Sequence, residues 1–316
     1  MQTSNVQLKA NFALGMVCII WGTTYYAIKI GVESMPPFLF LGIRQFIAGL
    51  VLVLILAMFR RHRSFLRWKY FKGQAVPGIF LIGLGNGLLG MAEKYVPTGL
   101  IGIIYSLVPI IVLMYNITFT KGYHINRFTV LSILFGLAGV VFLFGDNSQQ
   151  GPTDSSYNFG LILAFICAIC WAIGGIISKM TASSSNTLIN TAFQLISGGL
   201  FLFVLSLFFR ERLPTEIDRY ALWSLLYLTV VASLLTFNAY VYALKHLPLD
   251  TVAIHTYINP LVAIIIGWAL LDEPVTIFTV LAGGLILISV VFTNKSKKIK
   301  SSFGENRLHA RKGVSG

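Results

Sequence analysis

The sequence predicts an all-α integral membrane protein with ten transmembrane helices, arranged as two inverted five-helix repeats around a central cavity. Three observations indicate this fold class: the composition, the number of long apolar segments and an internal repeat. Of the 316 residues, 56% are hydrophobic and 11% are charged, with a mean hydropathy of +0.79. An ordinary soluble domain carries about 25% charged residues, so this chain has too few charges to cover a soluble surface. Lipid is therefore the expected solvent.

Ten apolar segments have, or come close to, the length of a spanning helix, which needs about 20 residues to cross about 30 Å of hydrocarbon. They are residues 11–30, 37–59, 74–93, 97–120, 127–144, 157–179, 187–209, 221–245, 249–271 and 275–293. The third and fourth segments, and the ninth and tenth, are joined by very short connections and should form antiparallel hairpins. The first segment lacks a small-x-small cleavage site, so we expect it to be retained rather than removed as a signal peptide.

The charge distribution predicts the orientation. The net charge of +13 comes from 24 Lys and Arg against 11 Asp and Glu, and it lies in short connectors and in the tail, 294–316. With the N-terminus inside, 18 basic residues fall on the inner side and 4 on the outer side. Because basic residues gather on the cytoplasmic side, we expect both termini in the cytoplasm and the chain in the cell membrane, the inner membrane in a bacterium. The basic tail should contact anionic lipid, and this distribution argues against nucleic acid as a partner.

Landmarks in the first half of the chain recur about 150 residues later. Trp21 and Lys29 correspond to Trp171 and Lys179. Further matches are Gln45-x-x-Ala48-Gly49 with Gln194-x-x-Ser197-Gly198, and Ala92-x-Lys94-x-x-Pro97 and Pro109 with Ala243-x-Lys245-x-x-Pro248 and Pro260. This predicts two repeats, 11–144 and 157–293, each with five spans. Because five is odd, the second repeat should be inverted relative to the first, as in many secondary transporters. An old duplication with an unrelated purpose is the alternative.

Motifs in both halves resemble one known family. Ala243-Leu-Lys-His-Leu-Pro, Tyr257-Ile-Asn-Pro260-Leu-Val-Ala and Leu271-Asp-Glu273-Pro274 are similar to the second repeat of EamA-type proteins of the drug/metabolite transporter superfamily. Trp21-Gly22, Lys29-x-Gly31, Arg44 and Gly49-Leu50 resemble the first repeat. The resemblance covers residues 12–293 and implies ten spans, cytoplasmic termini and export of small metabolites or drugs. One departure is Lys121-Gly122, which stands where the second half has Asp272-Glu273.

Mid-depth prolines and polar side chains predict a central cavity. Pro109 and Pro260 are expected to break the fourth and ninth segments at equivalent positions, although each could be a kink that only improves packing. The candidate cavity-lining residues are polar or aromatic and lie at comparable depths. They are Trp21, Thr24, Tyr25, Gln45, Asn86, Tyr105, Trp171, Gln194, Asn238, Tyr242, His255, Tyr257 and Asn259. For each of them, hydrogen bonding between helices is the alternative role.

Charged residues within the segments are candidates for gating or coupling, because an unpaired charge in a membrane is costly. They are Lys29, Arg44 and Glu93. We hypothesise that Arg44 pairs with Glu93 or with backbone carbonyls near the outer mouth and shapes gating. A static ion pair is the alternative. Glu93 is the one carboxylate expected in a span and therefore the candidate for proton coupling.

The expected function is that of a secondary transporter that moves a small organic metabolite or drug-like compound, with amino-acid-like compounds among the candidates. We expect export by alternating access of the two repeats. Cys18, Cys167 and Cys170 lie in apolar segments, so neither a metal site nor a cofactor is expected. No P-loop and no glycine-bracketed serine occurs in the sequence, which argues against an enzyme. A non-transporting receptor or accessory subunit is the alternative.

Overall fold

The structure is a computed structural model of the chain, and it describes residues 2–58, 68–119, 125–144, 155–181, 187–253, 255–289, 291–292 and 295. Every regular element in these ranges is a helix, and no strand occurs in them. The basic tail from residue 296 onward and the Lys121-Gly122 pair lie outside the described residues. Expectations for those two segments therefore stay predictions.

Within the described ranges, the first half of the chain forms seven α-helices and one π-helix. These are α1 (Gln2–Ser34), α2 (Pro37–Met58), α3 (Trp68–Gly78), η2 (Ile79–Asn86), α4 (Gly87–Ala92), α5 (Thr98–Tyr105), α6 (Val108–Phe119) and α7 (Arg127–Phe144). The second half forms α8 (Ser155–Thr181), α9 (Thr187–Phe208), α10 (Arg219–Tyr227), η4 (Leu228–Phe237), α11 (Asn238–His246), α12 (Leu249–Val252) and α13 (His255–Leu271). A further helix, Ile277–Ser289, follows α13.

Seven helical segments within the described ranges are long and apolar enough to cross a membrane. They are Asn5–Ser34, Pro37–Met58, Phe71–Ala92, Thr98–Phe119, Ser156–Thr181, Thr187–Phe208 and Arg219–His246. The fifth, ninth and tenth predicted spans correspond to shorter apolar helices, Arg127–Gly139, Ile258–Leu271 and Ile277–Ser289. The chain is therefore a multi-pass helical membrane protein, while the count of ten spans and the inversion of the repeats stay predictions.

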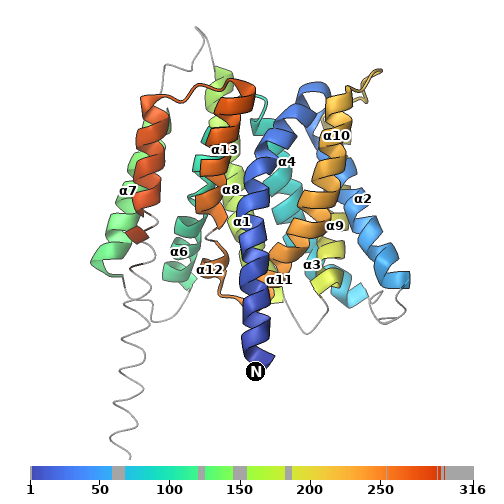
Figure 1. Cartoon of the computed structure of the whole chain (residues 1–316), viewed down its shortest axis with the longest axis horizontal. Helices are drawn as coiled ribbons and strands as arrows, with labels where there is room; N and C mark the ends of the chain where they lie inside the picture. Colours follow the sequence, from blue (N-terminus) through green and yellow to red (C-terminus); the bar gives the residue numbers. More distant parts are fainter. Residues whose placement is uncertain are drawn as a thin grey trace, which may run out of the picture.

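The helices run roughly side by side, with α1 through the middle of the molecule (Figure 1). The N-terminus lies at one end of this assembly, and the connection between α1 and α2 lies at the other. In the same view α7 lies at one side and α2 at the other. Helix α1 packs on α13, α11, α10 and η4, whereas α2 packs on α9. Helix α1 of the first half therefore packs mainly on elements of the second half.

A π-helix occurs at the same place in each half, although the sequence analysis did not predict it. The segments η2 and η4 begin about 150 residues apart, and each leads directly into an α-helix. Asn86 Nδ2 donates to the carbonyl of Leu81 over 3.4 Å, and Thr236 Oγ1 donates to the carbonyl of Val231 over 2.7 Å. In both pairs the donor lies five residues after the acceptor, so a polar side chain donates to a π-helical carbonyl in each half. Such π-helical stretches are frequent at functional sites.

Two glutamates of the second half of the chain cap the N-termini of helices in the first half. The carboxylate of Glu211 accepts hydrogen bonds from the backbone N–H groups of Phe38 and Leu39, over 3.2 and 2.8 Å, at the start of α2. The carboxylate of Glu273 accepts from the N–H and the hydroxyl of Thr98, over 2.9 and 2.6 Å, at the start of α5. A negative charge here satisfies free N–H groups and complements the helix dipole. These contacts hold the two halves together at this end.

Candidate functional site

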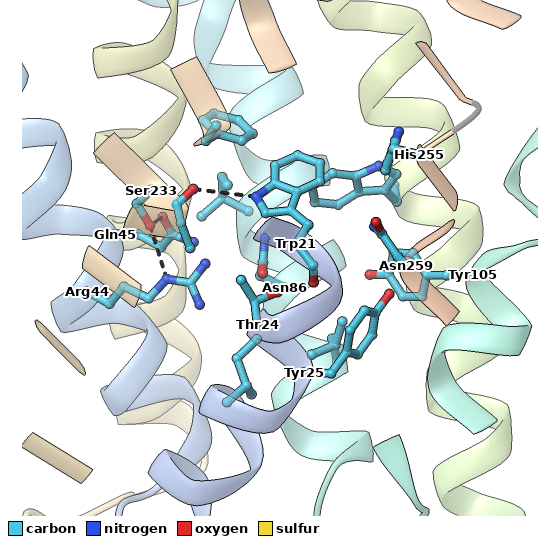
Figure 2. Close-up of a pocket in the computed structure, with 16 residues that line it drawn as sticks. Trp21, Thr24, Tyr25, Arg44, Gln45, Asn86, Tyr105, Ser233, His255 and Asn259 are labelled. Carbon is cyan, nitrogen blue, oxygen red and sulfur yellow. Dashed lines mark hydrogen bonds between the residues drawn. The ribbon is translucent and has the colours of Figure 1, made fainter. Parts of the chain in front are cut away.

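A central cavity lies between helices of both halves (Figure 2). It is lined by α1, α2, η2, α4 and α5 from the first half and by α8, η4 and α13 from the second. Its lining residues are Trp21, Thr24, Tyr25, Ile28, Arg44, Gln45, Ile82, Asn86, Leu89, Tyr105, Trp171, Ala232, Ser233, Phe237, His255 and Asn259. The free volume inside is about 40 Å³. At about 10–15 Å³ for each water, the cavity holds a few waters in this conformation.

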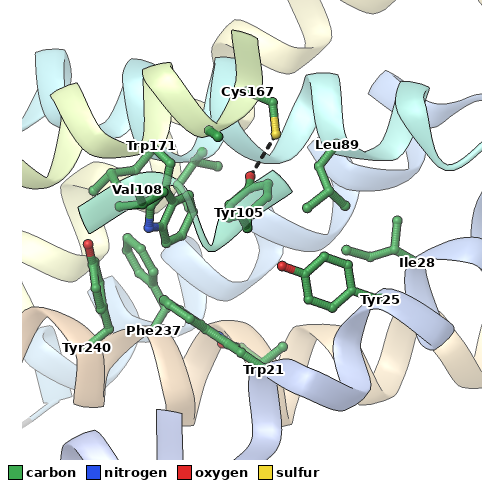
Figure 3. Close-up of a cluster of buried hydrophobic side chains, with 14 of the residues drawn as sticks. Trp21, Tyr25, Ile28, Leu89, Tyr105, Val108, Cys167, Trp171, Phe237 and Tyr240 are labelled. Carbon is green, nitrogen blue, oxygen red and sulfur yellow. Dashed lines mark hydrogen bonds between the residues drawn. The ribbon is translucent and has the colours of Figure 1, made fainter. Parts of the chain in front are cut away.

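Aromatic rings form one wall of the cavity (Figure 3). The ring centroids of Trp21 and Trp171 are 5.2 Å apart in an edge-to-face arrangement. Trp21 also lies 4.9 Å from the ring of Tyr240 and 5.3 Å from that of His255. Tyr105 continues the wall, with its ring 6.1 Å from Trp171. Edge-to-face rings at these separations attract one another, so the wall is both apolar and ordered.

Arg44, Gln45 and Ser233 form a polar group on the opposite side of the cavity in Figure 2. Arg44 Nε donates to Ser233 Oγ over 3.1 Å, and Ser233 Oγ donates to Gln45 Oε1 over 2.9 Å. Only 4% of Arg44 is exposed, and its Nη1 has no hydrogen-bond partner within the described ranges. Arg44 is the one Lys, Arg, Asp or Glu among the lining residues. The cavity therefore contains a buried positive charge, and none of its described lining residues carries a counter-charge.

His255 and Asn259 on α13 are held by backbone carbonyls. His255 Nδ1 lies 2.7 Å from the carbonyl of Val252. The side-chain nitrogen of Asn259, in the orientation that satisfies its neighbours, donates to the carbonyls of Cys18 and His255 over 2.9 and 3.0 Å. Tyr105 similarly donates to the carbonyl of Gly85 over 3.1 Å. These residues thus line the cavity and also form hydrogen bonds, some of them between helices, so the two roles considered from the sequence are combined.

The structure brings nine of the thirteen candidate residues together at the cavity. These are Trp21, Thr24, Tyr25, Gln45, Asn86, Tyr105, Trp171, His255 and Asn259. Three others lie elsewhere. Gln194 donates to Gln74 Oε1 and Ser178 Oγ over 2.7 and 3.0 Å, Asn238 accepts from Thr191 over 3.1 Å, and Tyr242 packs on His246. The side chain of Tyr257 lies outside the described residues.

The hypothetical pair between Arg44 and Glu93 does not form. Arg44 donates to Ser233, and both carboxylate oxygens of Glu93 are buried without a hydrogen-bond partner in the described part of the chain. Glu93 is fully buried, and its backbone carbonyl accepts a hydrogen bond from Lys29 Nζ. The pairing hypothesis was wrong because Arg44 turns toward η4, whereas Glu93 lies at the end of α4.

The two prolines affect their helices differently. In the first half the helix stops at Tyr105, and α6 begins at Val108, directly before Pro109. In the second half α13 continues through Pro260, and the interruption lies earlier, between α12 and His255. Pro260 has no N–H to bond to the carbonyl of Thr256. Ser106 Oγ donates to that carbonyl over 2.8 Å instead, so α13 need not break there.

Sequence reasoning missed several lining residues, of which Ser233 matters most. It connects Arg44 to Gln45, but a single serine in an apolar segment carries no distinctive pattern. The spacing of Asn86 and Thr236 could have indicated the paired π-helices, because the two residues are 150 apart. In the described ranges, no group of three or more His, Cys, Asp or Glu side chains could hold a metal ion.

Comparison with known proteins agrees with this architecture. The EamA-like transporter family matches residues 8–145 and again residues 158–295. The chain is 30% identical over 287 residues to the uncharacterized inner membrane transporter YedA of Escherichia coli (strain K12), covering 90% of each chain. It is 28% identical over 288 residues to the uncharacterized transporter YoaV of Bacillus subtilis (strain 168), covering 91% of this chain and 97% of that one.

A crystal structure of another protein has a similar fold. The two chains align with a TM-score of 0.65 over 92% of this chain and 98% of the other, at 20% sequence identity. That likeness supports the fold alone. The family match covers nearly the whole described structure, and it occurs twice, once in each half of the chain. The chain therefore belongs to the EamA-like transporter family.

Proposed function

We propose that this protein is a secondary transporter that carries a small organic solute across the cell membrane, with the central cavity as its substrate site. The supporting observation is that elements from both halves enclose an aromatic and polar cavity around α1. Rocking of one half against the other would open such a cavity to one side at a time. Export is the direction that the family resemblance favours.

The cavity is narrow in this conformation. A free volume of about 40 Å³ is too small for an organic solute, since it holds only a few waters. The proposed cycle therefore includes states in which the cavity widens toward one face and then toward the other. An alternative is a receptor or accessory subunit, in which the cavity would open to one face or to neither.

Cysteine labelling separates these functions. Thr24 lines the cavity and lies near Arg44 in Figure 2, and the native cysteines are all buried. We expect Thr24→Cys to react with a membrane-impermeant maleimide in vesicles of either orientation, because each face gains access in turn. Ser206→Cys is a matched control, since Ser206 is buried on α9 away from the cavity. Labelling of Thr24→Cys from one face only would contradict alternating access.

Glu93 is the proposed proton-coupling group. Its carboxylate is buried and has no hydrogen-bond partner in the described ranges, so a charge there is poorly stabilised. Lys29 and Glu273 are the charged groups that act on it electrostatically. Protonation and deprotonation of Glu93 can therefore accompany changes in the distances to these two groups.

Glu93→Gln should abolish the dependence of transport on a pH gradient while leaving the fold intact, because glutamine keeps the shape but cannot release a proton. The measurement is solute flux in proteoliposomes with and without a pH gradient. Glu216→Gln is the control, since Glu216 is exposed. An unchanged response to the gradient in Glu93→Gln would exclude Glu93 as the coupling group.

A further inference from the structure

The guanidinium of Arg44 is the most unusual group in the cavity. Arginine has five N–H donors and stays charged in proteins. In the described part of the chain, Arg44 uses one donor, Nε, in its hydrogen bond to Ser233 Oγ. No carboxylate of the described residues is within hydrogen-bond distance of its Nη1, and 4% of the residue is exposed. Among the described residues, its buried Nη1 group has no hydrogen-bond partner.

The hydrogen bond to Ser233 sets the direction of these free donors. Ser233 is itself held by Gln45 Oε1, so the Nε side of the guanidinium is fixed to η4. Figure 2 shows the guanidinium extending from α2 toward the interior, with Thr24 and Asn86 beyond it in this view. The remaining edge, formed by Nη1 and Nη2, is the fork that binds a carboxylate through two parallel hydrogen bonds.

The rest of the cavity indicates what the anion would be attached to. Trp21, Trp171 and Tyr105 provide ring faces and edges, and Phe237 and Ile28 add apolar surface. These side chains favour a planar apolar body. None of the described lining residues is an Asp or Glu, so this lining offers an ammonium no negative group. A single arginine also balances one negative charge rather than two.

On this basis we propose that the cavity binds a monovalent organic anion with an aromatic or otherwise planar apolar body, and that Arg44 binds its carboxylate. This rests on the proposed transport function and defines its substrate class. The cavity must widen to admit the compound, and the charge of the compound then compensates that of Arg44. The carboxylate of the substrate would thus supply the negative charge that the described lining residues do not provide.

The test is binding of four related probes to the purified full-length protein, measured by isothermal titration calorimetry. The probes are phenylacetate, its neutral isostere phenylacetamide, the cation 2-phenylethylamine and the zwitterion phenylalanine. We expect phenylacetate to bind about 10- to 100-fold more tightly than phenylacetamide, which is the range for a charged hydrogen-bonded pair. Equal affinities for the acid and the amide, or a preference for the cation or the zwitterion, would overturn the proposal.

Arg44→Met makes the test specific to this side chain. It should lower the affinity for phenylacetate by the same 10- to 100-fold and leave the affinity for phenylacetamide unchanged. The affinity of Arg44→Lys for phenylacetate should lie between those of Arg44→Met and the wild type. Arg219→Met is the control, because Arg219 is exposed at the start of α10. If Arg44→Met lowers the affinity for both probes equally, Arg44 maintains the shape of the cavity and does not bind the carboxylate, which would overturn the proposal.

The melting temperatures of the wild type and of Arg44→Met show whether a loss of binding reflects poor folding. Removing a buried charge that has no counter-charge among the described residues should leave the melting temperature of the free protein unchanged or higher, because the relief of desolvation offsets the lost hydrogen bond to Ser233. In contrast, a structural Arg44 would make Arg44→Met less stable, which would contradict the proposal. Phenylacetate should raise the melting temperature of the wild type but not that of Arg44→Met.

The outcome is separable from that of the transport proposal. Alternating labelling of Thr24→Cys without any binding of phenylacetate would overturn the substrate class and leave transport standing. Binding of phenylacetate with labelling from one face only would support the anion site and overturn transport. Binding of chloride alone, with no effect of the organic probes, would show that Arg44 holds an inorganic anion and would also overturn the proposal.

Discussion

Gly78→Ala should destabilise the protein by about 3 kcal/mol, the upper part of the range for overpacking a core. Gly78 ends α3 and faces α9. A Cβ atom on it would lie 2.5 Å from the carbonyl oxygen and 2.7 Å from the Cα of Gln194, and it would also clash with Ser197 Oγ. Two of these are backbone atoms, which cannot move away without shifting α9. Gly198 faces the same contact, since its own Cβ would lie 2.7 Å from the carbonyl of Gly78.

The matched control is Gly73→Ala on the same helix. Nothing lies within 4 Å of a Cβ at Gly73, so this change should be neutral or should stabilise the helix by about 0.5–1 kcal/mol through alanine's higher helix propensity. Thermal unfolding in one detergent compares the two variants with the wild type. Equal melting temperatures for Gly78→Ala and Gly73→Ala would contradict the close approach of α3 and α9.

Lys179→Met should reduce transport at least about tenfold, because each hydrogen bond to a charged group contributes about 1.5–3 kcal/mol. Lys179 Nζ donates to the carbonyls of Leu244 and Leu247 over 2.5 and 2.7 Å, at the C-terminal end of α11. A cation there satisfies free carbonyls and complements the helix dipole. The two bonds tie α8 to the end of α11.

Lys29 makes the equivalent contact in the first half, where its Nζ donates to the carbonyl of Glu93 at the end of α4. Helix α11 lies toward the end of the molecule that carries the N-terminus, and α4 lies toward the other end (Figure 1). The two lysines therefore restrain opposite ends. Breaking one contact should populate the state that is open at that end.

We therefore expect the two variants to increase access to the cavity from opposite faces of the membrane. The measurement is maleimide labelling of each variant in the Thr24→Cys background. Lys179→Met should raise labelling from the face that carries the N-terminus, and Lys29→Met should raise it from the opposite face. Lys9→Met is the control, since Lys9 is exposed on α1. A shift toward the same face in both variants would show that the lysines support the fold without restraining either end.

Much of the site could be predicted from the sequence because its residues recur at a regular interval. Trp21 and Trp171 both line the cavity, and Lys29 and Lys179 both bind helix-terminal carbonyls. Gln45 and Gln194 were predicted by the same reasoning, but they differ in the structure. Gln45 lies in the cavity, whereas Gln194 bonds to Gln74 and Ser178. Equivalent positions in a repeat therefore need not have equivalent neighbours.

The sequence by itself determined that this chain is helical, lies in a membrane and carries a repeated pattern, because length, hydropathy and spacing are properties of each segment alone. Only the tertiary structure decided that Arg44 faces Ser233 rather than Glu93, and that Ser106 satisfies the carbonyl of Thr256. These contacts depend on how each helix is rotated about its axis and which helix packs beside it. Successive residues on a helix point about 100° apart, so a small rotation changes which side chains meet.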